Sequence, residues 1–168
     1  MKNKIVNHKR NGMYWFLLSI AVVVMNIIII YNAAHKSDKI GEVVGNSPGV
    51  ILFITFISLS YFFRHRPDVH KRLLPFAAIS MLGPALARFP ERYELLRFAT
   101  LDMNVIVYGL VVPVALWLSV LVYDLFTLKK PHFITVISIS LNVGSIFLFV
   151  FLTTSGWGMK YVEFLKSI

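Results

Sequence analysis

Two histidines, His70 and His132, are the side chains of this sequence best suited to bind a cofactor. Each follows a basic segment and a proline, which places both near the amino-terminal ends of expected helices. Neutral imidazole binds metals and haem iron, so a shared haem or metal site is one interpretation. Histidines at helix starts near lipid headgroups also cap the helix or contact phosphate, and this second role stays open beside the first.

Asp124 is an acidic residue expected at the same end of the bundle as these histidines. It lies near the carboxyl end of its helix, where the helix dipole disfavours a negative charge. We therefore expect a cationic partner, with Arg66, Arg72, Lys129 or a histidine as candidates. The candidate ligand or functional cluster comprises Arg66, Asp68, His70, Arg72, Asp124 and His132. The chain has no cysteine, and two imidazole nitrogens alone form an incomplete zinc site, so the metal stays unknown.

Five apolar runs must position these side chains. They cover residues 13–31, 48–63, 73–89, 103–126 and 133–153. A bilayer core about 30 Å thick needs about 20 apolar residues per helix. Hydrophobic residues make up 57% of the chain and charged residues 15%. The sequence therefore predicts an all-α membrane helix bundle, with about five transmembrane helices in a single domain over residues 1–168. Residues 90–100 mix charged and apolar side chains, which predicts an amphipathic helix on the outer surface.

Lysines and arginines lie in the breaks between the apolar runs and predict the orientation of the chain. With the amino terminus in the cytoplasm, ten of the 17 fall on the cytoplasmic side, where basic residues are normally enriched. We therefore expect a multi-pass protein of the cytoplasmic membrane with a cytoplasmic amino terminus and an external carboxyl terminus. The net charge of +9 is then explained by topology and by anionic lipid at the cytoplasmic face, rather than by nucleic acid.

Two further contacts between helices are expected. Arg88 and Asp102 lie at a similar depth beside the outer loop, and a structural ion pair would lower the cost of holding either charge near lipid. On the fifth apolar run, small polar residues share a broad helical face with His132, namely Thr135, Ser138, Asn142 and Ser145. That face is expected to meet the face of the third helix that carries His70.

A spaced motif runs through the middle of the chain. It reads Arg66-Pro67, then His70-Lys71-Arg72-Leu73, then Pro84-Ala85 and Arg88, followed by Tyr123-Asp124-Leu125 and His132. This pattern, over roughly residues 61–157, resembles an uncharacterised family of small bacterial multi-pass membrane proteins. The resemblance implies a polytopic membrane protein and implies no particular activity.

Three functional classes are compatible with these residues. The first is a non-enzymatic accessory or interaction subunit of a membrane complex or homo-oligomer, which small size and minimal loops favour. The second is a haem- or metal-binding membrane protein that uses His70 and His132. The third is a small transporter or lipid-handling protein, although the sequence shows no inverted repeat. Hydrolase chemistry is disfavoured, because the sequence has no Gly-x-Ser-x-Gly, His-Glu-x-x-His or phosphate-binding loop motif.

Overall fold

The computed structural model describes residues 2–36, 40–87 and 107–167, and every regular element in these segments is helical. The elements in chain order are α1 (Lys2–Lys36), α2 (Ile40–Phe62), α3 (Pro67–Ala87), the π-helical turn η2 (Val107–Val111), α6 (Val112–Leu128), α7 (Phe133–Thr154) and α8 (Trp157–Lys166). The predicted all-α bundle is therefore confirmed. The predicted amphipathic segment 90–100 and the predicted Arg88–Asp102 pair lie outside the described residues.

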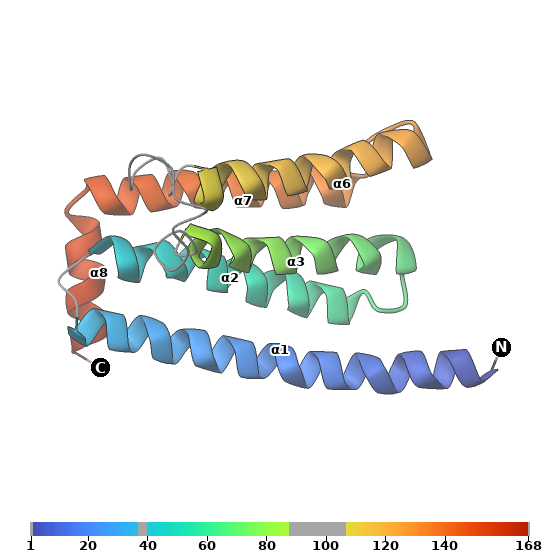
Figure 1. Cartoon of the computed structure of the whole chain (residues 1–168), viewed down its shortest axis with the longest axis horizontal. Helices are drawn as coiled ribbons and strands as arrows, with labels where there is room; N and C mark the ends of the chain where they lie inside the picture. Colours follow the sequence, from blue (N-terminus) through green and yellow to red (C-terminus); the bar gives the residue numbers. More distant parts are fainter. Residues whose placement is uncertain (1, 37–39, 88–106, 168) are drawn as a thin grey trace, which may run out of the picture.

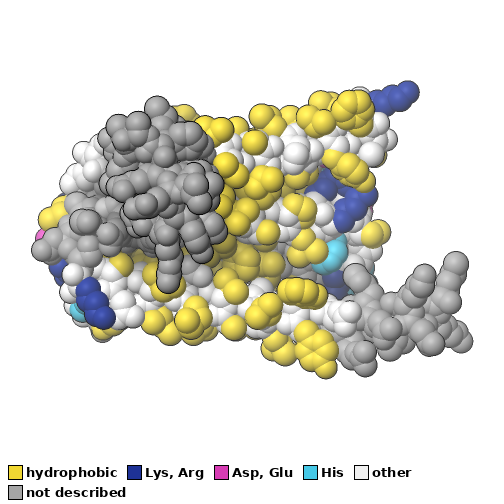
Figure 2. Space-filling view, in the orientation of Figure 1, with side chains coloured by type: hydrophobic (Ala, Val, Ile, Leu, Met, Phe, Trp, Pro, Cys, Tyr) yellow, Lys and Arg dark blue, Asp and Glu magenta, His cyan; other side chains and the backbone are white. Residues whose placement is uncertain are grey.

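The five long helices lie roughly side by side, and α8 crosses them at one end (Figure 1). At the other end α1 begins, residues 63–66 connect α2 to α3, and residues 129–132 connect α6 to α7. We call this end the amino-terminal face. Hydrophobic side chains cover the length of the bundle, and lysines and arginines lie near its two ends (Figure 2). This distribution is typical of a bundle whose sides contact lipid.

Four helical segments are long and apolar enough to cross a membrane, among the described residues. They are Asn11–Lys36, Val43–Phe62, Gly109–Leu128 and Phe133–Thr154. The third predicted span, residues 73–89, corresponds to α3, whose 21 residues cover about 32 Å at about 1.5 Å per residue. Its length therefore matches a bilayer core, but Asp68, Lys71 and Arg72 make its first turns polar.

Several element boundaries differ from those predicted by the apolar runs, since α1 begins at Lys2 and α3 begins at Pro67, before the predicted starts at 13 and 73. Helix α2 begins at Ile40, eight residues before the predicted start at 48, and keeps the buried Pro48 within it. Neighbouring helices surround this proline, which is the setting in which membrane helices tolerate it. The chain also forms a separate carboxyl-terminal helix, α8, whose Val162 packs with Ile30 of α1 and Val43 of α2.

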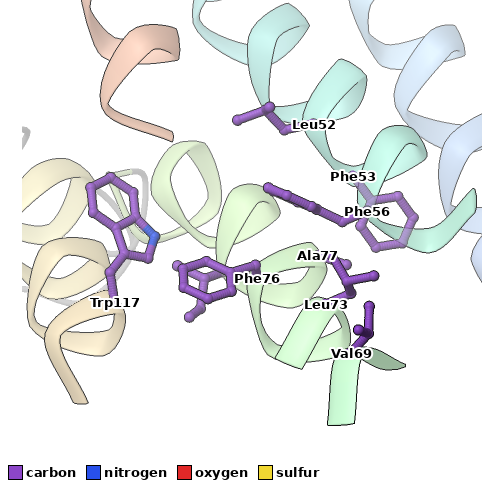
Figure 3. Packing of buried hydrophobic residues seen from close by; sticks show 9 residues of the cluster. Leu52, Phe53, Phe56, Val69, Leu73, Phe76, Ala77 and Trp117 are labelled. Carbon is purple, nitrogen blue, oxygen red and sulfur yellow. The ribbon is translucent and has the colours of Figure 1, made fainter. Parts of the chain in front are cut away.

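The largest apolar core lies between α2, α3 and α6 (Figure 3). Phe56 of α2 and Phe76 of α3 are both fully buried, and their ring centroids lie 6.0 Å apart. Close approach of these two helices requires a glycine at position 49, because a Cβ there would lie 2.7 Å from the carbonyl oxygen of Ser80. Small residues at such crossings allow tight packing in membranes, where the hydrophobic effect does not drive helix association.

Candidate functional site

A buried ion pair joins α3 to α6 near the amino-terminal face. Asp124 of α6 is fully buried and Arg72 of α3 is 4% exposed. Arg72 Nε and Nη2 both donate to Asp124 Oδ1, at 2.9 and 2.6 Å. Arg72 Nη1 donates to the backbone carbonyl of Asp68 at 2.6 Å, so all three kinds of guanidinium nitrogen have an acceptor. Of the cationic side chains considered for Asp124, Arg72 is therefore the one that forms an ion pair with it.

The second carboxylate oxygen of Asp124 faces α7. Thr135 Oγ1 donates to Asp124 Oδ2, and the backbone N–H of His132 donates to the same oxygen at 3.2 Å. The amino terminus of α7 carries partial positive charge, which favours an anion there. Asp124 thus has four donors from α3 and the start of α7, while its own backbone belongs to α6. We call the side chains of Arg72, Asp124 and Thr135 the buried network.

Local sequence explains why Asp124 can reach the start of α7. Helix α6 ends at Leu128, and the cap residue Lys129 follows with a φ of 56°, a left-handed conformation that reverses the chain. Pro131 follows and holds the preceding residue out of the helical region. The short connection therefore brings His132 back beside Asp124, eight residues earlier in the chain.

His132 caps helix α7. Its backbone is extended, and its Nδ1 accepts a hydrogen bond of 3.2 Å from the backbone N–H of Ile134. Its Nε2 lies 3.7 Å from Asp68 Oδ2, at the start of α3. Asp68 is half exposed, so this contact lies at the rim of the amino-terminal face. From the sequence, His132 could cap its helix or bind a metal or haem. In the structure it caps α7.

His70 contacts a different helix. Its Nδ1 lies 2.9 Å from both the hydroxyl and the carbonyl oxygen of Ser60, at the end of α2. The ring accepts from the hydroxyl or donates to the carbonyl, depending on its tautomer. Ser60 itself is buried and His70 is half-buried. No sequence signal identified Ser60 as this partner.

The six predicted site residues therefore fall into three groups. Asp68, Arg72, Asp124 and His132 are joined by direct contacts. His70 faces Ser60, and the exposed Arg66 lies in the connection, where its carbonyl accepts from His70 N–H at 2.9 Å. Among the described residues, no three His, Cys, Asp or Glu side chains are grouped as metal ligands would be.

The polar face predicted on the fifth apolar run points into the bundle. Thr135, Ser138 and Asn142 are all buried, and Asn142 Nδ2 donates to the carbonyl of Ser138 at 2.8 Å. Ser138 Oγ and Trp117 Nε1 are buried atoms without a hydrogen-bond partner. Apart from Thr135, which binds Asp124, these side chains act within the helix packing.

In comparisons with models of protein families, with curated proteins and with solved structures, nothing matches this chain, so the family resemblance of residues 61–157 stays a prediction.

Proposed function

We propose that this protein is a small, non-catalytic subunit that packs against other proteins in a membrane. The observation that carries this proposal is the saturation of the buried network. Asp124 has four donors within the chain, and Arg72 donates to two different acceptors. Ionisable groups at membrane depth usually mark a substrate pathway or a proton relay. Here the two charges hold α3, α6 and α7 together, which suits a scaffold.

The outer surface of α1 is the part of this scaffold that we assign to a partner. Within Asn11–Lys36, the buried side chains are Ser19, Ile30 and Ala34. Large apolar side chains on the opposite face are exposed, among them Leu18 at 52% and Met25 at 58%. A helix that buries so little of its surface within its own bundle leaves most of that surface for a helix of another subunit or of a second copy.

Photo-crosslinking in living cells tests this assignment. A photoreactive amino acid replaces Leu18 or Met25 on α1, and a matched probe replaces Phe147 on α7, which is 70% exposed. We expect discrete protein adducts from the two α1 positions and lipid adducts alone from position 147. The partner is identified by mass spectrometry and checked by reciprocal purification, and an adduct of twice 19.2 kDa identifies a second copy.

Two results would contradict the proposed function. The first is identical crosslinking to lipid alone from all three positions, which would make α1 an ordinary lipid-facing helix. The second is a Soret band in gently purified protein that disappears in His70→Ala and in His132→Ala. That band would favour the haem-binding alternative, in which both imidazoles turn away from Ser60 and the α7 cap.

We also propose that the amino-terminal face lies in the cytoplasm. Its exposed basic side chains are Arg64, Arg66, Lys71, Lys129 and Lys130, whereas Asp68 is its exposed acidic residue in the described part of the chain. This excess supports an orientation with the amino terminus inside and the carboxyl terminus outside, while a bacterial inner membrane is proposed from the family resemblance of residues 61–157.

Reporter fusions test this orientation. A reporter active only in the cytoplasm should work when inserted after Arg66 and fail when fused to Ile168. A periplasmic reporter should give the reverse pattern at the same two sites. A cytoplasmic reporter that is active at Ile168 would place both ends on one side and would contradict an odd number of spans.

A further inference from the structure

A groove of about 440 Å³ opens at the amino-terminal face, between α1 and the end of α2. Its lining residues are Phe16 of α1 together with Ser58, Tyr61, Phe62, Arg64 and His65. The volume lies within the range of about 300–1,000 Å³ that is common for small-molecule sites. None of the six lining residues is acidic. The groove is separate from the buried network and from His70, and neither of these contributes to its lining.

The groove has an apolar wall and a cationic end. The rings of Phe16 and Tyr61 stack with their centroids 4.7 Å apart, which joins α1 to α2. The guanidinium carbon of Arg64 lies 4.6 Å from the centroid of the Tyr61 ring. This cation–π contact positions Arg64 without using its N–H groups as hydrogen-bond donors to an acid. A planar guanidinium with free donors is well suited to bind the oxygens of a phosphate.

The position of the groove matches the depth of a lipid headgroup. The apolar segment of α2 ends at Phe62, and Arg64 and His65 follow after Phe63. Ser58 lies one helical turn deeper than Phe62, towards the middle of the bundle. Aromatic side chains such as Tyr61 and Phe62 are common at the boundary between acyl chains and headgroups. A lipid beside these residues would have its phosphate at Arg64 and its chain along Ser58 and Phe16.

We propose that this groove is a binding site for one anionic glycerophospholipid. Arg64 and His65 contact the phosphate, while Phe16, Ser58 and Phe62 contact an acyl chain. Charge complementarity selects an anionic lipid, because the exposed cations of this face outnumber its exposed carboxylate in the described residues. The site goes beyond the proposed scaffold function, and it does not depend on a protein partner at the outer face of α1.

Native mass spectrometry of the full-length protein in mild detergent tests this site. Phosphatidylglycerol and phosphatidylcholine with identical acyl chains are titrated separately onto the wild type and four variants, of which Arg64→Lys keeps the positive charge. Arg64→Gln removes the charge, Ser58→Trp fills the groove, and Lys130→Gln removes an exposed cation of the same face outside the groove. We expect the wild type to bind one phosphatidylglycerol with preference over phosphatidylcholine, and Arg64→Gln to weaken that binding about fivefold.

The controls separate a built site from general electrostatics. Lys130→Gln should change phosphatidylglycerol binding by less than about twofold, because surface charges outside the groove act only through the screened field. Ser58→Trp should weaken the binding of both lipids. Arg64→Lys should keep most of the affinity for phosphatidylglycerol, because the loss in Arg64→Gln comes from the missing charge and not from a change in the fold. Glycerol phosphate, which lacks acyl chains, should not displace the lipid.

Three outcomes would overturn the proposal. Equal losses in Arg64→Gln and Lys130→Gln would show diffuse attraction to the whole basic face. Unchanged binding in Ser58→Trp would show that no acyl chain lies in the groove. Displacement of the lipid by glycerol phosphate would show a site for the free phosphate group. Melting temperatures of all variants in the same detergent identify any loss that comes from unfolding.

Discussion

Arg72→Met is expected to destabilise the bundle by about 3–5 kcal/mol, because it leaves the buried Asp124 carboxylate without its cation. Methionine keeps much of the aliphatic volume of arginine, so the loss measures the missing charge more than a cavity. Thr135 and the backbone of His132 would still donate to Asp124 Oδ2, but Oδ1 would lose both of its donors. Reversible unfolding of purified protein in mixed micelles measures this difference in free energy.

The neighbouring Lys71 offers a matched control for that substitution. Lys71→Met removes one positive charge from the same helical turn, but its side chain is exposed. Surface substitutions of this kind usually change stability by within about 0.5 kcal/mol. Equal losses of stability in Lys71→Met and Arg72→Met would contradict a specific role for the buried pair.

The double variant Arg72→Met with Asp124→Leu separates a structural pair from a functional one. A buried ion pair replaced by apolar residues of similar volume is often as stable as the original. We therefore expect the double variant to recover most of the stability that Arg72→Met loses. If the network only holds the helices together, the double variant should also keep the α1 crosslinks of the wild type. Recovered stability with lost crosslinks would show that the charges themselves serve the function.

Apolar run length and spacing could predict most of the helices but not their ends. The runs at 13–31 and 133–153 lie within α1 and α7, because a membrane helix is fixed by about 20 consecutive apolar residues. The early part of α2 packs against α8, where Val162 lies in one cluster with Val43 and Tyr161 Oη donates to Ser47 Oγ at 3.0 Å. A hydrogen bond between residues so far apart in the chain leaves no local signal in the sequence.

The sequence could predict which residues of the candidate site lie at the same end of the bundle. Topology alone places His70, Asp124 and His132 at the same face, since connections between consecutive helices are short. It cannot decide which cation reaches Asp124, because that choice depends on the rotation of α3 about its axis. The contact of Gly49 with the backbone of Ser80 fixes how closely α2 and α3 approach. The sequence shows a glycine at position 49. It does not show how α3 is rotated about its axis when Ser80 contacts that glycine.

Phe76→Ala is expected to destabilise the bundle by about 2–3 kcal/mol. Phe76 is fully buried and packs in the cluster of α2, α3 and α6 (Figure 3). In water the loss would combine a transfer term with a cavity term, for a typical total of about 3–5 kcal/mol. Lipid tails are as apolar as the core, so the transfer term largely disappears and the loss of packing remains. The expected value is therefore smaller than for a soluble protein.

Phe126→Ala is the matched control for Phe76→Ala, since Phe126 has the same side chain and is 83% exposed on α6. We expect it to change the free energy of unfolding by less than about 0.5 kcal/mol, because a flexible lipid chain fills the space that the ring leaves. Unfolding of both variants in mixed micelles gives the comparison. Equal losses at the two positions would mean that Phe126 is covered in the folded protein. Such a result would place a partner on α6, where the scaffold proposal expects lipid.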